Sequence, residues 1–144
     1  MTRYQAFIYK EIKYVRYMLE DYDEFAINFA AYHSQQVVEK ICGYICQQLG
    51  IKSIRSHNIL QWIKHLQSFN VKIPDLIVEK AEEITEWEET TRYNINFQES
   101  RRDINQVLDV CEKWLEEVDK IKIKRGIEIE KNVNGNNLFK KNND

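Results

Sequence analysis

Proline and glycine are scarce in this sequence, which has one proline and four glycines in 144 residues. A fold made of many short strands needs these residues in its turns, so their scarcity argues against a turn-rich β fold. It favours a few long helices joined by short loops. The length is that of a single domain with enough residues to form a proper hydrophobic core.

Long apolar runs and a strong net charge are also missing. No apolar run reaches the length of about 18 residues that indicates a transmembrane helix, and the start of the chain, Met1 to Ala6, lacks the apolar stretch of a signal peptide. We therefore expect a cytoplasmic protein without membrane contact. The formal net charge is only −2, so no overall positive field attracts nucleic acid, although a local basic patch is compatible with this charge.

Cysteine occurs in an odd number, as Cys42, Cys46 and Cys111. An odd count without a secretion signal argues against a disulfide framework. Cys42 and Cys46 lie one helical turn apart on an apolar stripe, where a free cysteine behaves as a small hydrophobic residue. No Cys or His pair has the spacing of a zinc site, and His57 and His65 are too far apart on a helix to share one ion without other ligands. The sequence therefore predicts buried free thiols and no metal.

What the sequence does contain is helical periodicity. Apolar residues recur at helical spacing in five segments, at about residues 4–22, 24–49, 59–69, 75–90 and 97–122. The short loops between them favour antiparallel neighbours. We therefore predict an all-α fold, an up-and-down helical bundle of four main helices plus a short extra helix at 59–69. Residues 1–124 form the expected domain, and residues 125–144, which are rich in Asn and Lys, form a polar and mobile C-terminal tail.

Residues with capping preferences mark the expected helix ends. Asp23 is a candidate N-cap for the second segment and Ser56 for the third. Gly50 can take the left-handed conformation that ends a helix. Asn96 with Glu99 resembles a capping box before the last helix.

The second segment carries polar residues on a helix that is otherwise suited to the core. Phe25 and Phe29 begin an apolar stripe wide enough for neighbours on more than one side. His33, Gln36 and Lys40 follow at spacings of three and four, so they share one face. Each has a structural interpretation, because His33 and Gln36 could hydrogen-bond a neighbouring helix and Lys40 could pair with a nearby surface residue.

The fourth segment has an acidic face and is followed by an arginine. Its six glutamates within residues 79–89 predict a solvent-exposed helix face. Residues 91–96 interrupt the helical pattern and are expected to form a loop. In such a loop Arg92 and Tyr93 could hold a phosphate and stack on a base. In the alternative interpretation, Arg92 pairs with the preceding glutamates and Tyr93 fills the edge of the core.

No arrangement typical of catalysis is present in the sequence. No Ser, Cys or Thr has an evident His and acid partner. Gly43 and Gly50 are isolated, so there is no glycine-rich loop that could cradle a phosphate. The sequence predicts no cofactor.

Several of the residues above occur in an order that resembles a known family. The order is Ala30-x-x-His33-x-Gln35-Gln36-x-x-Glu39-Lys40, then Gly50, then His57-Asn58-Ile59-Leu60, then Thr91-Arg92-Tyr93 before a final amphipathic helix. Over roughly residues 4–122 this pattern resembles a HEPN domain (higher eukaryotes and prokaryotes nucleotide-binding). The resemblance implies a helical bundle similar to the C-terminal domain of kanamycin nucleotidyltransferase.

The resemblance also bears on catalysis. Many HEPN domains are metal-independent ribonucleases whose motif is an Arg and a His separated by four to six residues. The Arg would stabilise charge on the phosphorane while the His moves a proton. Arg92 stands at the place of that Arg, but no His occurs after His65. The motif is incomplete, so the activity is not carried over unless the fold brings His33 or His57 beside Arg92.

We therefore expect a non-catalytic HEPN-like module that binds a nucleotide or an RNA phosphate. The expected ligand-binding residues are Arg92, Tyr93, Lys40, His33 and His57. The resemblance further implies a homodimer and a partner of the minimal nucleotidyltransferase class, as in toxin–antitoxin pairs. The alternatives are a ribonuclease with a rearranged site, and a protein that acts only through interaction or dimerisation by its acidic helix and its aromatic residues.

Overall fold

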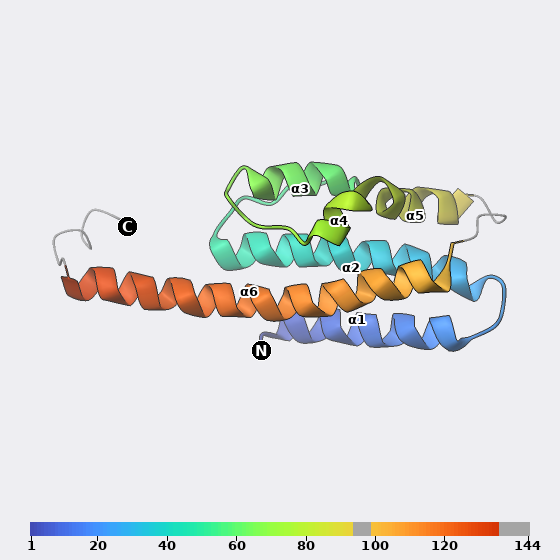
Figure 1. Ribbon diagram of the computed structural model, residues 1–144, viewed down its shortest axis with the longest axis horizontal. Coiled ribbons are helices and arrows are strands. Elements are labelled where there is room, and N and C mark those ends of the chain that lie inside the picture. The colour runs from blue at the N-terminus through green and yellow to red at the C-terminus, as the bar shows by residue number, and fades with distance from the viewer. Residues whose placement is uncertain (94–98, 136–144) are drawn as a thin grey trace.

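The computed structural model describes residues 1–93 and 99–135, with side chains for residues 1–89 and 99–120. Every regular element in this part of the chain is a helix (Figure 1). In chain order the helices are α1 (Arg3–Glu20), α2 (Ala26–Leu49), α3 (Ile59–Gln67), α4 (Asp75–Glu79), α5 (Ala81–Tyr93) and α6 (Arg101–Gly135). The predictions made for Asn96 and for the last residues of the tail lie outside the described residues.

The central helix is α2, as its wide apolar stripe predicted. It packs against α1, α3, α5 and α6, and Figure 1 shows α1 on one side of it and α3 to α5 on the other. The side chains that fill the core come from all six helices and include Ile8, Ile12, Ile41, Tyr44, Ile63, Ile77, Trp87, Ile104 and Leu115. The prediction of an all-α bundle with four main helices, flanked by the short α3, is confirmed.

Polar contacts of one arginine in α1 also join this helix to α6. The Arg16 guanidinium forms ion pairs with Asp109 at 2.7 Å and with Glu112 at 2.8 Å, and it also donates to the side-chain oxygen of Asn105 at 3.0 Å. These partners lie one helical turn apart or less along α6, so a single arginine holds two full turns of that helix.

The predicted helix ends are correct in part. Gly50 takes the left-handed conformation at φ 67° and ends α2, as predicted. The N-cap of α2 is Phe25, so the prediction of Asp23 was wrong. The Asp23 carboxylate instead accepts a hydrogen bond from the Phe25 N–H at 2.8 Å, in the turn before the helix. The N-cap of α3 is Asn58, whose side chain accepts from the N–H groups of Leu60 and Gln61. The prediction that Ser56 is the N-cap of α3 was wrong. The Ser56 hydroxyl accepts a hydrogen bond from the backbone N–H of Asn58, which is itself the N-cap.

Three predicted boundaries were also wrong. The helix expected at 75–90 is interrupted at Lys80, which has φ −99° and ψ 12°. No glycine or proline marks this break in the sequence. Residues 91–93, expected in a loop, are the last turn of α5, because intrinsic propensity is a weak guide where a helix packs on a neighbour. The last helix begins at Arg101 and continues to Gly135, past the expected end near Lys122. The boundary of the domain at residue 124 stays a prediction.

Some residues lie on an unexpected face of their helix. Phe25 and Phe29, expected in the apolar stripe, are exposed, whereas Glu88 of the acidic face is buried. Cys42, Cys46 and Cys111 are buried free thiols, as predicted. In the part of the chain described here, no helix is both long enough and apolar enough to cross a membrane.

Candidate functional site

A carboxylate in α1 faces two basic side chains of α2. The Lys40 ammonium donates to both carboxylate oxygens of Glu11, at 2.8 Å and 3.0 Å. The Nδ1 atom of His33 lies 3.6 Å from the same carboxylate. His33 and Lys40 were predicted to share a face of α2, and the structure brings them together on one partner. The pairing of Glu11 with Lys40 also fixes α1 against α2.

The charge of Glu11 is maintained by these neighbours. Burial alone would raise the pKa of its carboxyl group, but the hydrogen bonds from His33 and Lys40 outweigh burial and lower that pKa. Glu11 is therefore ionised at neutral pH and balances the charge of Lys40. A phosphate placed at Lys40 would have to approach this carboxylate, and repulsion between like charges disfavours such a pose.

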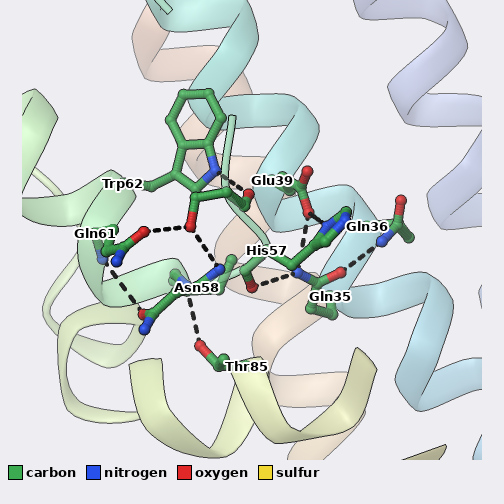
Figure 2. Close-up of polar contacts among 10 residues, drawn as sticks. Gln35, Gln36, Glu39, His57, Asn58, Gln61, Trp62 and Thr85 are labelled. Carbon is green, nitrogen blue, oxygen red and sulfur yellow. Dashed lines mark hydrogen bonds and ion pairs between the residues drawn. The ribbon is translucent and has the colours of Figure 1, made fainter. Parts of the chain in front are cut away.

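His57 occupies a second site, on the α3 side of α2. Its Nδ1 atom lies 3.1 Å from the Glu39 carboxylate. The same Glu39 oxygen accepts from the Gln35 amide at 3.0 Å, and this amide also donates to the backbone oxygen of His57 at 3.1 Å. Figure 2 shows Gln35, Glu39 and His57 converging between α2 and the loop before α3. Gln36, predicted to bond a neighbouring helix, instead donates to Gln35.

The loop that carries His57 is held from two further directions. The Trp62 indole N–H donates to the backbone oxygen of Ser56 at 2.8 Å. The backbone N–H of Ile59 donates to the Thr85 hydroxyl of α5 at 3.0 Å (Figure 2). Gln35, Glu39 and His57, whose order contributed to the family resemblance, therefore meet in one polar network. Their evident role is to fasten α3 to α2 and α5.

Arg92 and Tyr93 form the last turn of α5, and their side chains lie outside those described. The network relates the position of this turn to α2, because residues 57–59 hydrogen-bond both to Gln35 of α2 and to Thr85 of α5. The two helices run in opposite directions (Figure 1). Arg92 comes seven residues after Thr85, and Asn28 comes seven residues before Gln35, which is about 10 Å of helix in each case. Asn28, in the first turn of α2, and Arg92, in the last turn of α5, therefore lie toward the same end of the bundle.

Asn28 has an unusual environment for a buried polar residue. It is 6% exposed, and its Oδ1 atom has no hydrogen-bond partner in the described part of the chain. An unsatisfied buried oxygen costs free energy unless a donor reaches it, so such atoms call for an explanation. A ligand that supplies an N–H or O–H group next to Arg92 is one explanation.

Three carboxylates, one from α5 and two from the chain at or just before the start of α6, lie close together. Glu83, Glu99 and Asp103 each place an oxygen within 4.8 Å of the others. Burial and a hydrogen bond with Glu99 raise the pKa of Glu83. Burial would also raise the pKa of Glu99, but hydrogen bonds from the Ser100 N–H and the Trp87 indole outweigh burial and lower that pKa. Lys80 lies 3.4 Å from Glu83 and 3.8 Å from Asp103. A shared proton and this lysine can balance the cluster, so it gives no reason to infer a metal.

The predicted ligand residues thus fall into three places. His33 and Lys40 share Glu11, His57 joins Glu39, and Arg92 with Tyr93 ends α5. Two residues of interest were missed by sequence reasoning. Glu11 gives no local signal, because its partner belongs to another helix. Asn28 could have been found, since it precedes Gln35 by seven residues and therefore lies on the same face of α2.

Comparison with known proteins gives a family. A family model described as HEPN domain matches residues 3–121 of the chain. No curated protein and no solved structure matches it. The matched range begins at the first residue of α1 and ends within α6, so it covers the polar network and all three places described above.

Proposed function

The chain belongs to the HEPN domain family, and from this premise we propose that it is a non-catalytic module that binds a nucleotide or an RNA phosphate at the end of α5. Arg92 would hold the phosphate, Tyr93 would stack on a base, and Asn28 would accept a hydrogen bond from the sugar or the base. The carrying observation is that the buried Oδ1 atom of Asn28 has no hydrogen-bond partner among the described residues and lies toward the same end of the bundle as the Arg92 turn.

His33, Lys40 and His57 belong to the proposal as flanking residues rather than as phosphate ligands. Each of them already contacts a carboxylate of this chain, at Glu11 or at Glu39. A basic group that already pairs with a carboxylate attracts a further anion more weakly than an unpaired one does, because the carboxylate repels that anion. We therefore expect changes at these three positions to weaken binding less than changes at Arg92.

The absence of catalysis rests on the histidines. No histidine follows His65 in the sequence. The Nε2 atom of His65 lies 2.5 Å from the backbone oxygen of Lys52, and both other histidines contact carboxylates. A ribonuclease of the family type needs a histidine free to move a proton beside the arginine. Incubation with labelled RNA in the absence of metal should leave the RNA intact, and cleavage lost in both Arg92→Ala and His33→Ala would establish the ribonuclease alternative.

Binding is tested by calorimetric titration with ATP, AMP and a short single-stranded RNA. We expect at least one of these to bind, and we expect Arg92→Ala to weaken it tenfold or more without lowering the melting temperature. Arg55→Ala is the matched control, because Arg55 is exposed in the loop before α3. Failure of every probe to bind the wild type would refute the proposal.

A second proposal is binding to a partner nucleotidyltransferase in a toxin–antitoxin-type pair. The observation that favours a protein partner is the row of exposed carboxylates on α4 and α5, at Glu79, Glu82, Glu86 and Glu89. This row would suit a basic surface. Co-expression with a minimal nucleotidyltransferase encoded beside this chain should give a complex that dissociates as salt rises. A complex insensitive to salt, or no complex, would contradict this second proposal.

A further inference from the structure

A groove runs along α1, which lies at the edge of the bundle (Figure 1), beside His33 of α2. It has a volume of about 360 Å³, and its walls are mainly the apolar side chains Phe7, Tyr14, Val15 and Met18. Phe7 and Tyr14 are 57% and 55% exposed, so this wall is open to solvent in the described part of the chain. Sites that hold small molecules are concave, mostly apolar and about 300–1,000 Å³ in volume. The groove has the size and the lining of such a site.

A second hollow adjoins this groove toward the start of α1 and the end of α2. It has a volume of about 500 Å³, and Phe7 lines both hollows. The second hollow is the more polar of the two, because Arg3 brings a cation to it and Gln47 and Gln48 bring amide groups. The surface of α1 therefore changes from apolar beside Tyr14 to polar and basic beside Arg3.

The charges around the two hollows favour an anion. Arg3 and Lys10 are exposed, and neither forms an ion pair with a described residue. The carboxylate in the groove, Glu11, is paired with the Lys40 ammonium at 2.8 Å, so cations outnumber carboxylates here and attract a negative group. Its favoured place is beside Arg3, about 12 Å along α1 from Glu11 and thus beyond the screening length of about 8 Å.

We propose that the groove binds a single-chain anionic amphiphile of the fatty-acid class. Its hydrocarbon chain lies against Phe7, Tyr14 and Met18, and its carboxylate accepts hydrogen bonds from the Arg3 guanidinium. Arg3 and Tyr14 are about 16 Å apart along the helix, so the occupant is an extended chain rather than a single ring. The site uses none of the residues of the nucleotide site proposed at the end of α5, and the two proposals are independent.

The chemistry of the groove distinguishes this occupant from a nucleotide and from a bilayer. A nucleotide is polar along its whole length, and burying its polar groups against the carbon wall from Tyr14 to Met18 would cost free energy. A helix that lies on a membrane inserts its apolar side chains among the lipids and needs no hollow. A hydrocarbon chain with a charged end uses both features, because apolar burial supplies affinity and Arg3 fixes the orientation.

The first test is calorimetric titration of the whole chain with fatty acids from hexanoate to dodecanoate, each below its micelle concentration. Each added CH₂ that enters the groove should raise the affinity about three- to fourfold, and the rise should stop when the groove is full. Protonated dodecylamine has the same chain with the opposite charge, so it should bind about tenfold or more weakly than dodecanoate. Failure of every carboxylate to bind, or equal affinity for the amine, would overturn the proposal.

The second test uses paired substitutions at exposed positions. Tyr14→Glu places a carboxylate on the apolar wall and should weaken dodecanoate binding about tenfold or more. Tyr17→Glu is its matched control, because Tyr17 is an exposed tyrosine of the same helix that lines neither hollow, and it should change the affinity less than about twofold. Arg3→Gln should weaken dodecanoate binding about fivefold, whereas Lys13→Gln, at another exposed cation of α1, should not.

Equal effects within either pair would contradict the proposal, because they would show a response to net charge and not to the groove. Circular dichroism shows whether each variant is folded.

Two further measurements identify a different occupant. Sedimentation equilibrium without ligand should give the same mass for the wild type and Tyr14→Glu, and a wild-type dimer that this change dissociates would show that a second copy covers the groove. Phosphatidylglycerol vesicles free of fatty acid should not carry the protein with them in a flotation assay. Flotation of the wild type but not of Tyr14→Glu would show that this side of α1 binds a bilayer. Either result would overturn the assignment to a fatty acid.

Discussion

The ammonium of Lys40 lies 2.8 Å from the carboxylate of Glu11 and so ties the central helix α2 to α1 across the bundle. The Glu11 side chain is mostly shielded from solvent, and Lys40 is partly so. The pair therefore combines an interhelical hydrogen bond with charges that are screened less than those of a surface ion pair. Its effect on stability is open to direct measurement.

Replacing Glu11 with Gln should destabilise the protein. The change keeps the shape of the side chain but leaves the Lys40 ammonium without its counter-charge. A hydrogen bond to a charged group contributes about 1.5–3 kcal/mol, and we expect a loss near the lower end because Lys40 can turn toward water. Urea unfolding gives the free energy of unfolding. Glu20→Gln, at an exposed glutamate of the same helix, should change it by less than about 0.5 kcal/mol.

The contribution of Glu11 should depend on pH in one direction. Its pKa in the folded protein is lower than the ordinary value of 4.5, so the unfolded chain takes up the proton first as pH falls. The stabilisation is complete above the unfolded pKa and is lost as pH falls through the folded pKa. The difference in unfolding free energy between wild type and Glu11→Gln should therefore shrink between about pH 6 and about pH 3. A difference that stays constant over this range would show that the carboxylate charge contributes nothing.

Gln35 should be more important for stability than its neighbour Gln36. Gln35 is fully buried and donates to Glu39 and to the backbone oxygen of His57. Gln35→Ala removes both of these hydrogen bonds from a buried site and opens a small cavity, so we expect a loss of about 2–4 kcal/mol. Gln36→Ala removes one hydrogen bond from a half-buried side chain and should cost about 1 kcal/mol or less. Chemical denaturation of both variants checks the order, and equal losses would contradict the network as described.

The cysteines should be unreactive as long as the protein is folded. Burial raises the pKa of the Cys42 and Cys111 thiols well above their ordinary value, and the thiolate is the reactive form. An aromatic disulfide reagent should therefore modify no thiol in the native protein and all three in urea. Rapid modification of one thiol under native conditions would show that the helix carrying it opens locally.

The sequence was informative wherever the relevant physics is local. Helical periodicity predicted the buried faces of α1 and α6, and the conformational freedom of glycine predicted the end of α2 at Gly50. The same periodicity could not distinguish a core face from an outer face. Phe25 and Phe29 continue the stripe of α2 in sequence, yet both side chains are exposed, whereas Ala30 and Ala31 beside them are buried.

For the candidate site, the sequence suggested residues but not their arrangement in space. His33 and Lys40 were grouped correctly, because both belong to one helix face. Their shared partner Glu11 belongs to α1, and the spacing of residues along the sequence does not show which residues of two different helices come into contact. His57 was expected near a ligand but joins Glu39, since the position of the loop before α3 depends on contacts with both α2 and α5.

Asn28 offers a test that separates a structural role from a binding role. Its buried Oδ1 atom has no partner among the described residues, so Asn28→Ala removes an oxygen that contributes no hydrogen bond there. We expect the free energy of unfolding to fall by about 1 kcal/mol or less, clearly less than for Gln35→Ala. If the oxygen serves a ligand beside Arg92, affinity for the nucleotide or RNA that binds wild type should fall about tenfold or more. A large loss of stability with unchanged affinity would make Asn28 a structural residue and remove the main support for a site at the end of α5.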